Sequence, residues 1–174
     1  MNVVAKTYAL KDYDKIVIQA QKDETSCGFT ALSMVLQYYG ISLSQEQLQT
    51  LQDQLLGHKP GLDFTHIDEL ISSIKASKAS AYNYMGPFIG MERGKAQIIT
   101  TAPDAISGGW PLHALIPVEV YGYFNLTTNT FTSTGEKFID PAWGGGFRTI
   151  SYGIYYNTTT TPNNPFGSFW NIKK

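Results

Sequence analysis

The chain contains one cysteine, Cys27, and its position favours a nucleophile over a buried space-filler. A thiol with a pKa of about 8.5 is mostly protonated at neutral pH, and it becomes a strong nucleophile when a helix N-terminus or a cationic imidazole stabilises the thiolate. Cys27 lies where an apolar helical pattern begins, after four capping-type residues at 23–26. Gly28, next along the chain, would let a substrate backbone approach closely. This placement is typical of a cysteine hydrolase, and the alternative is a small core residue.

A cysteine nucleophile needs an imidazole partner, and the chain offers His58, His66 and His113. His58 lies in the turn GHKPG. His66 lies in the first turn of a predicted helix, where the helix dipole disfavours a charged ring. His113 lies at the start of a strand pattern in the C-terminal half. One cysteine and scattered histidines give no metal-ligand spacing, so no metal or other cofactor is expected.

The composition argues against several other classes of protein. The 174 residues fit one domain, with 43% hydrophobic and 16% charged residues as in globular proteins. A net charge of -1 gives no electrostatic reason to expect binding to nucleic acid or anionic membranes. The sequence has no apolar run long enough to span a membrane and no visible signal peptide. The Tyr-, Thr- and Asn-rich C-terminal half favours a secreted or extracytoplasmic location over a cytoplasmic one, and nothing indicates an oligomeric state.

Helical patterns occupy the first half of the chain. KIVIQA at 15–20 predicts a short strand before them. Capping and stop residues then predict three helices, at 26–40, at 42–57 with Ser42 or Ser44 as its cap, and at 63–74 with Asp63 or Thr65 as its cap. The second helix has four leucines at helical spacing, which are expected on its buried face: Leu48, Leu51, Leu55 and Leu56.

Strand and turn patterns occupy the second half. A brief helix is predicted at 103–106, and strands at 112–124, 136–140, 147–156 and 169–172, with a Gly-rich corner at 144–146. Helices followed by strands predict an α+β fold. The whole of 1–174 is expected to be one domain, with a helical part at about 24–80 and a β part at about 110–174.

A motif around Cys27 connects the chain to a known family. Gln21 lies six residues before Cys27, Gly28 follows it, and the segment ALSMVLQYYG completes a helix that ends in Tyr-Gly. This pattern, over residues 19–40, resembles the papain-like cysteine peptidases. It is most similar to the bacterial branch that includes the double-glycine leader peptidases of bacteriocin exporters. The resemblance implies a papain-like fold in which the cysteine begins a helix packed against an antiparallel sheet.

The resemblance also implies roles for individual residues in peptide-bond hydrolysis. The Gln21 amide and the Cys27 backbone N–H would form the oxyanion hole, since neutral donors must face the developing negative charge. Gln19 is a nearby alternative, eight residues before the cysteine. His113, on a strand that faces the helix, would be the base. Asp140, in an Asp-Pro pair, would orient the histidine ring.

Two features depart from the family pattern. The family has a Gly-Tyr pair six residues after the histidine, whereas Gly122 follows His113 by nine residues and Pro117 interrupts the run. Either a bulge or a bend in that strand is expected, or GGWPLHALI is the preceding strand and the position of the catalytic histidine is vacant. The connection from Gly122 to Phe138 is also long and predicts an extended hairpin.

Three functional alternatives follow from this comparison. A peptide or protein is the expected substrate of an active enzyme, and Trp110 and Trp143 would line its cleft unless they are core residues. Leader peptidases of this branch recognise a Gly-Gly site and are attached to transporter membrane segments, and the sequence shows no apolar run of that kind. If the histidine position is vacant, the chain would be an inactive module that binds a peptide or partner. The same triad also serves amide-forming or deamidating chemistry.

Overall fold

One antiparallel sheet and three helices organise the chain in the computed structural model, which describes residues 2–74, 80–82, 95–101, 113–142, 146–151 and 166–172. The helices are α1 (Cys27–Tyr38), α2 (Gln45–Leu56) and α3 (Ile67–Ser73), with short 3-10 helices η1 (Tyr13–Lys15) and η2 (Phe64–His66). The strands are β1 (Val3–Ala9), β2 (Ser80–Tyr82), β3 (Ala96–Thr101), β4 (His113–Asn125), β5 (Thr130–Asp140), β6 (Gly146–Ser151) and β7 (Phe166–Ile172). This arrangement has the predicted α+β class.

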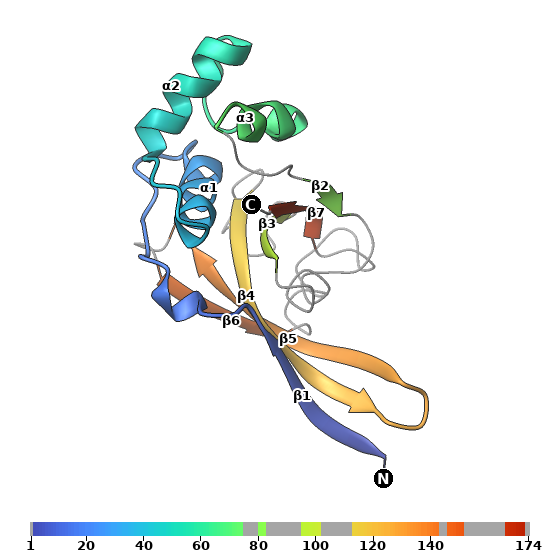
Figure 1. The fold of residues 1–174 in the computed structure, drawn as a ribbon. Coiled ribbons are helices and arrows are strands. Elements are labelled where there is room, and N and C mark those ends of the chain that lie inside the picture. The colour runs from blue at the N-terminus through green and yellow to red at the C-terminus, as the bar shows by residue number, and fades with distance from the viewer. Residues whose placement is uncertain are drawn as a thin grey trace.

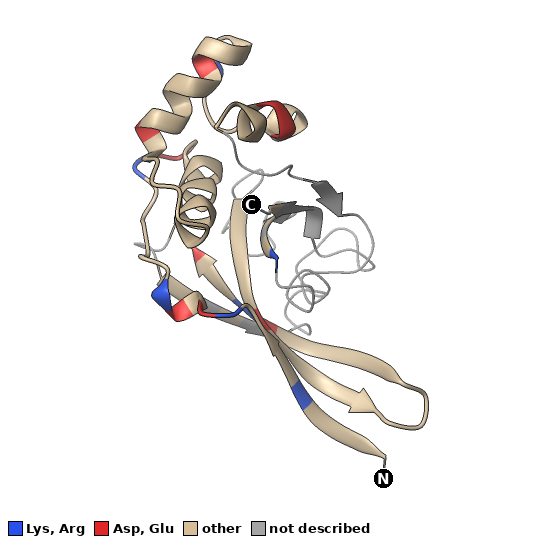
Figure 2. Cartoon of the chain, viewed as in Figure 1, with Lys and Arg blue, Asp and Glu red and all other residues tan. Residues whose placement is uncertain are grey.

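The strand β4 organises the sheet. The strands follow the order β2-β7-β3-β4-β5-β6, and β1 pairs with β4 off this path. The first residues of β4, 113–115, pair with β3, whereas residues 119–125 lie between β1 and β5. Beyond the body, β1 and the paired ends of β4 and β5 project as an arm away from the helices (Figure 1). In the arm, residues 2–9 and 120–135, Lys6 is the one charged side chain (Figure 2).

Helix α1 lies at the centre of the core. Its residues 28–36 are all buried, and the helix packs against β4 and β3. The helix begins at Cys27, and Gly40 follows its end with a φ of 83°. At that end the Tyr39 hydroxyl donates to the backbone oxygen of Ile172 and accepts from the backbone N–H of Ala96 at 3.0 Å. These bonds fix the far end of α1 to β7 and β3.

The predicted second helix forms, but it buries a different face. Ser44 caps α2 through a capping box with Gln47, which decides between the two predicted caps. The predicted inner face was wrong in part: Leu48 and Gln52 are buried, whereas Leu55 is 45% exposed. The spacing of the leucines did not predict that Gln52 is buried, because a polar side chain does not contribute to a hydrophobic pattern.

Two predictions for the N-terminal segment were also wrong or incomplete. The run at 15–20 is not a strand, because its backbone N–H groups at Val17 and Gln19 donate to the side chains of Gln37 and Met34 on α1. The strand β1, which the sequence did not predict, instead pairs with β4 in register from Val3 opposite Asn125 to Ala9 opposite Glu119.

The β-rich half follows the prediction closely. The pairing of β4 with β5 is irregular between Pro117 and Glu119 and again between Tyr121 and Gly122, as the predicted bulge requires. The long connection is a hairpin whose turn occupies 126–129. The predicted helix at 103–106 and the corner residues 144 and 145 lie outside the described residues. The sheet also takes in β1, β2 and β3, which precede the range 110–174, and the division of the chain into domains stays a prediction.

Candidate active site

Cys27 is the first residue of α1, and it directly follows a tight turn. Ser26 occupies the N-cap position, but its side chain turns back toward the preceding residues: its Oγ accepts from the backbone N–H groups of Lys22 and Asp23 at 3.1 and 3.2 Å. Its carbonyl oxygen accepts the first helical bond, from the Thr30 N–H at 2.9 Å. Cys27 itself is partly exposed and lies at the positive end of a helix dipole, which favours the thiolate form.

His113 and Asp140 form a pair in the protein interior. His113 begins β4 and Asp140 ends β5, and both side chains are fully buried. The ring Nε2 of His113 lies 2.6 Å from Oδ1 of Asp140, and the same oxygen accepts from the Ala142 N–H at 2.8 Å. The antiparallel pairing of β4 with β5 therefore brings together two residues that are far apart in the sequence.

The electrostatics of His113 depend on both of its neighbours. Burial alone would lower the pKa of His113, because it disfavours the charged ring. Hydrogen bonds with Asp140 and Cys27, and then the charges of the same two side chains, outweigh burial and raise the pKa of His113 from 6.5 to about 9. These two neighbours therefore favour the protonated form of the ring. The three residues predicted as a triad are thus neighbours, with His113 between Cys27 and Asp140.

Gln21 lies beside this group, but its side chain is turned to the local backbone. Its Nε2 donates to the carbonyl oxygen of Asp23 at 2.7 Å. Its backbone N–H donates to the carbonyl oxygen of Pro141 at 3.0 Å, which fixes the residue next to the end of β5. The alternative oxyanion donor Gln19 points elsewhere, because its Nε2 donates to Ser33 on α1 at 3.0 Å.

The remaining site candidates have other surroundings. Gly28 is buried, and a Cβ at that position would lie 2.7 Å from Cβ of Leu62. The packing against Leu62 is by itself a sufficient reason for a glycine at this position. The predicted contact between Gly28 and a substrate backbone stays a prediction. Trp110 and Trp143 lie outside the described residues. The other two histidines are exposed and pair with acidic residues of their own surroundings, His58 with Asp53 and His66 with Asp63, each at 3.0 Å.

Two contacts between distant segments support Cys27 and Gln21. They are the bond from Gln21 to Pro141 and the packing of Leu62 on Gly28. A local sequence pattern carries no signal for either contact. In the described part of the chain, no group of three or more His, Cys, Asp or Glu side chains could hold a metal ion. No helix there is long and apolar enough to cross a membrane.

Comparison with known proteins places this geometry in a family. The sequence profile of the Peptidase_C39 like family matches residues 13–136. The chain belongs to the Peptidase_C39 like family. The match starts at η1 and ends in β5, so it includes Gln21, Cys27 and His113, whereas Asp140 lies four residues beyond it. No curated protein matches the chain.

Solved structures show the same fold for this Peptidase_C39 like chain. One is a double glycine motif protease from an AMS/PCAT transporter in complex with the leader peptide, with a TM-score of 0.56 and 15% identity. That match covers 97% of this chain and 99% of the other. Another is the peptidase domain of Streptococcus ComA, a bi-functional ABC transporter of a quorum-sensing pathway, with a TM-score of 0.56, 14% identity and coverage of 91% and 99%. The predicted papain-like fold and the resemblance to the double-glycine leader peptidases are confirmed.

Proposed function

We propose that the chain is a cysteine peptidase that hydrolyses peptide bonds with Cys27 as nucleophile, His113 as acid and base, and Asp140 as orienter of the ring. One observation carries the proposal: His113 is held between Asp140 and Cys27, the cysteine that begins α1. Because the pKa of His113 is raised to about 9, an imidazolium is available to pair with a thiolate at neutral pH. Family membership supports this reaction class.

The proposed reaction is acyl transfer to sulfur followed by hydrolysis. The Cys27 thiolate attacks the peptide carbonyl carbon, and the carbonyl oxygen becomes an oxyanion. His113 gives its proton to the leaving amine, the C–N bond breaks, and a thioester with Cys27 remains. The neutral imidazole then takes a proton from a water molecule that attacks the thioester, which releases the acid and restores the thiolate. Asp140, bonded to Nε2, leaves Nδ1 as the nitrogen that would exchange the proton.

Gln21 and the backbone N–H of Cys27 would stabilise the oxyanion. For this role the Gln21 amide must leave the Asp23 carbonyl oxygen, to which it donates in the free protein. The backbone bond to Pro141 keeps the residue at the site while the side chain turns. Substrate binding and formation of the oxyanion hole are thereby coupled.

The proposed substrate is a peptide with a Gly-Gly pair at its cleavage site. A protein of the same fold is a double glycine motif protease seen in complex with a leader peptide. The low sequence identity limits that likeness to the fold, so the peptide class must be tested on this chain directly. A synthetic peptide with a central Gly-Gly, and a matched peptide with Ala-Ala, would be incubated with the protein and with Cys27→Ala, and the products identified by mass spectrometry.

Alkylation of Cys27 tests the proposal without a known substrate. An ordinary thiol reacts with iodoacetamide far faster at pH 8 than at pH 5, whereas a thiolate paired with an imidazolium still reacts at pH 5. We expect reaction at pH 5 in the wild type and its loss in His113→Ala. If Cys27 reacts as free cysteine does, the proposed nucleophile is refuted, and the alternative of an inactive module is then tested by direct measurement of peptide binding.

A further inference from the structure

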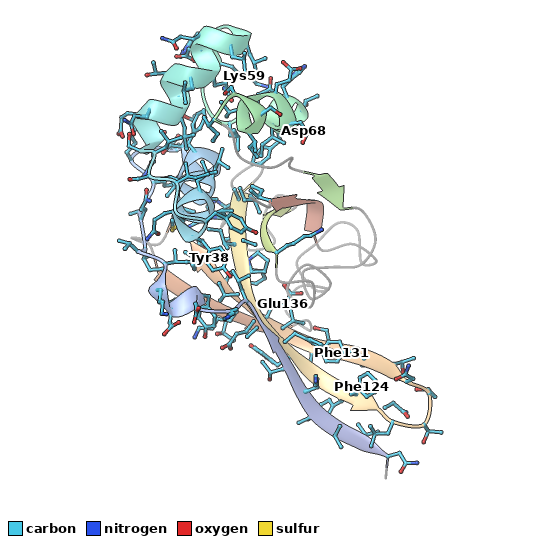
Figure 3. The ribbon with its side chains drawn as sticks, viewed as in Figure 1. Tyr38, Lys59, Asp68, Phe124, Phe131 and Glu136 are labelled. Carbon is cyan, nitrogen blue, oxygen red and sulfur yellow. The ribbon has the colours of Figure 1, made fainter. Side chains whose placement is uncertain are left out.

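The loop 57–63, between α2 and η2, reaches the nucleophile from the side of α2. Figure 3 labels Lys59 in this loop, close to the ends of α2 and α3. Two of its residues, Gly57 and Gly61, have φ values of 85° and 84°, a conformation that favours glycine. The loop therefore has a defined shape that returns the chain toward the start of α1.

The same loop touches the chain on both sides of Cys27. At Gly61 a Cβ would lie 2.8 Å from the carbonyl oxygen of Thr25, which precedes the cysteine by two residues. At Gly28, directly after the cysteine, a Cβ would lie 2.7 Å from Cβ of Leu62. Gly61 and Leu62 thus pack against the residues that fix where the first turn of α1 begins. A movement of the loop would shift the thiol or leave it loosely held.

Gln52 holds this loop from inside the protein. Its side chain is 1% exposed and uses both ends of its amide. The Nε2 donates to the carbonyl oxygens of Gly61 at 2.8 Å and Lys59 at 3.4 Å, and Oε1 accepts from the backbone N–H of Asp63 at 2.8 Å. One side chain therefore binds both sides of Leu62. The bond to Gly61 is buried and the bond to Asp63 is partly buried, so losing the amide removes the partner of groups that are shielded from water, which is more costly than losing an exposed bond.

We propose that Gln52 is a positioning residue for Cys27: it fixes the loop 59–63, and that loop holds the chain before and after the nucleophile. The inference rests on the proposed function, in which Cys27 attacks the substrate. Gln52 touches neither the substrate nor the reacting atoms and acts through Gly61 and Leu62. An amide is suited to this task because it donates and accepts at once, which no apolar side chain of similar size can do.

A neighbouring glutamine provides a matched control. Gln49, one turn earlier on α2, also binds the loop, through Nε2 to the carbonyl oxygen of Lys59 at 3.0 Å, and it binds Asp53 at 2.7 Å. It makes no bond to Gly61 or Asp63 among the described contacts, so it holds the outer part of the loop and not the part at Cys27. Replacing Gln49 removes a contact with the outer part of the loop only, whereas the same replacement of Gln52 removes the contacts with Gly61 and Asp63 beside Cys27. Comparing the two variants therefore shows whether it is the contacts near the cysteine that matter.

The test compares Gln52→Met with Gln49→Met and with Tyr39→Phe. Tyr39→Phe weakens the far end of α1 and measures the effect of lost stability alone. The readouts are the rate of Cys27 alkylation by iodoacetamide at pH 5.5, the midpoint of thermal unfolding, and kcat and KM on whichever peptide the wild type cleaves. We expect Gln52→Met to lower kcat about tenfold or more with little change in KM, because a small misplacement of a nucleophile has large effects on rate. Alkylation at pH 5.5 should fall with it, and both controls should keep the wild-type rates.

The outcomes distinguish this inference from the proposed function. If wild-type Cys27 is unreactive at pH 5.5, the proposed function fails. If the wild type is reactive and Gln52→Met alkylates at the same rate, the positioning role is overturned and the function stands. If Tyr39→Phe lowers the rate as much at an equal fall in unfolding temperature, the effect is one of general stability and the inference is again overturned. Should Gln52→Met not fold, Gln52→Glu keeps the acceptor for Asp63 and loses the donors to Gly61, and the same fall in rate is expected of it.

Discussion

The backbone N–H of Gln21 donates a hydrogen bond to the carbonyl oxygen of Pro141, at 3.0 Å. This bond joins the segment before the nucleophile to the turn after β5. Pro141 follows Asp140, Asp140 binds His113, and His113 interacts with Cys27, so a chain of contacts returns to the residue that begins α1. The four proposed catalytic residues come from three separate segments, and these contacts hold them in one group.

Because Gln21 lies in this group, we expect its side chain to contribute to the rate of peptide cleavage, whereas the Gln19 side chain should not. Gln21→Ala should lower kcat about a hundredfold to a thousandfold with KM little changed, as expected for loss of one oxyanion donor. Gln19→Ala is the matched control, because the Gln19 amide is bonded to Ser33. Steady-state kinetics on the cleaved peptide measures both variants. Equal losses in the two variants would assign the effect to the segment as a whole rather than to an oxyanion donor.

Asp140→Asn should lower the pKa of His113. Burial already acts to lower this pKa, the hydrogen bond with Asp140 is the largest opposing influence, and the charge of Asp140 adds to it. Without the carboxylate charge, burial weighs more heavily, so the value should fall clearly below about 9. NMR titration of the imidazole protons measures the change. Asp63→Asn removes the partner of the exposed His66 and should leave the His113 titration as it is. An unchanged His113 titration in Asp140→Asn would contradict the role of the carboxylate.

The raised pKa of His113 also predicts how stability depends on pH. A histidine whose pKa is higher in the folded state binds its proton more tightly there, so its stabilisation is complete below the unfolded value of 6.5. That stabilisation is lost as the pH rises through about 9. At about 1.4 kcal/mol per pKa unit, the loss in the free energy of unfolding is at most about 3 to 4 kcal/mol.

Urea unfolding at a series of pH values between 6 and 9.5, a range chosen to span both pKa values, measures this loss. The measurement is made in a Cys27→Ser background, because an unfolded thiol ionises over the same interval and a folded thiolate would offset the loss. Cys27→Ser, alone or with His66→Gln, should lose stability over this interval, since His66 is an exposed histidine outside the buried pair. Cys27→Ser with His113→Gln should lose less, because it has no ring proton to release. A Cys27→Ser protein whose stability rises over the same interval would show that the buried ring is neutral in the folded protein.

The sequence predicted the parts of the site that depend on local signals. Helix α1 begins at Cys27 and is followed by Gly40, because capping-type residues, an apolar periodicity and a stop glycine all lie within one short segment. The predicted bulge near Pro117 is likewise present. A proline cannot donate to a strand ladder, so its presence in a strand predicts an irregularity without any knowledge of the partner strand.

The parts that the sequence missed depend on contacts between distant segments. Strand β1 exists through its pairing with β4, more than a hundred residues later, and its mostly exposed residues show no apolar alternation that could predict it. The run at 15–20 has the β-branched residues of a strand, yet the side chains of α1 take the hydrogen bonds that a strand partner would take. Gln52 is buried because the loop 59–63 supplies its partners, which periodicity cannot indicate.

The packing of Leu62 on Gly28 predicts that Gly28→Ala destabilises the protein. In an exposed helix, Gly→Ala stabilises by about 1 kcal/mol. At Gly28 the new Cβ would lie 2.7 Å from Cβ of Leu62, and overpacking of this kind costs about 1–3 kcal/mol. Gly28→Ala should therefore lower the free energy of unfolding, measured by urea denaturation, despite the better helix propensity of alanine.

A double-mutant cycle with Leu62→Gly isolates this contact. Leu62→Gly is destabilising by itself, but it removes the nearest atoms that the new Cβ would meet and leaves Cζ of Phe64 at 3.2 Å. Gly28→Ala should therefore be clearly less destabilising in that background than in the wild type. Stabilisation by Gly28→Ala in the wild-type background would mean that the loop does not pack on α1, and the positioning role of Gln52 would lose its support. The double variant also tests whether Gly28 meets the substrate: if it folds and alkylates normally but cleaves poorly, the added methyl group obstructs the peptide backbone beside Cys27.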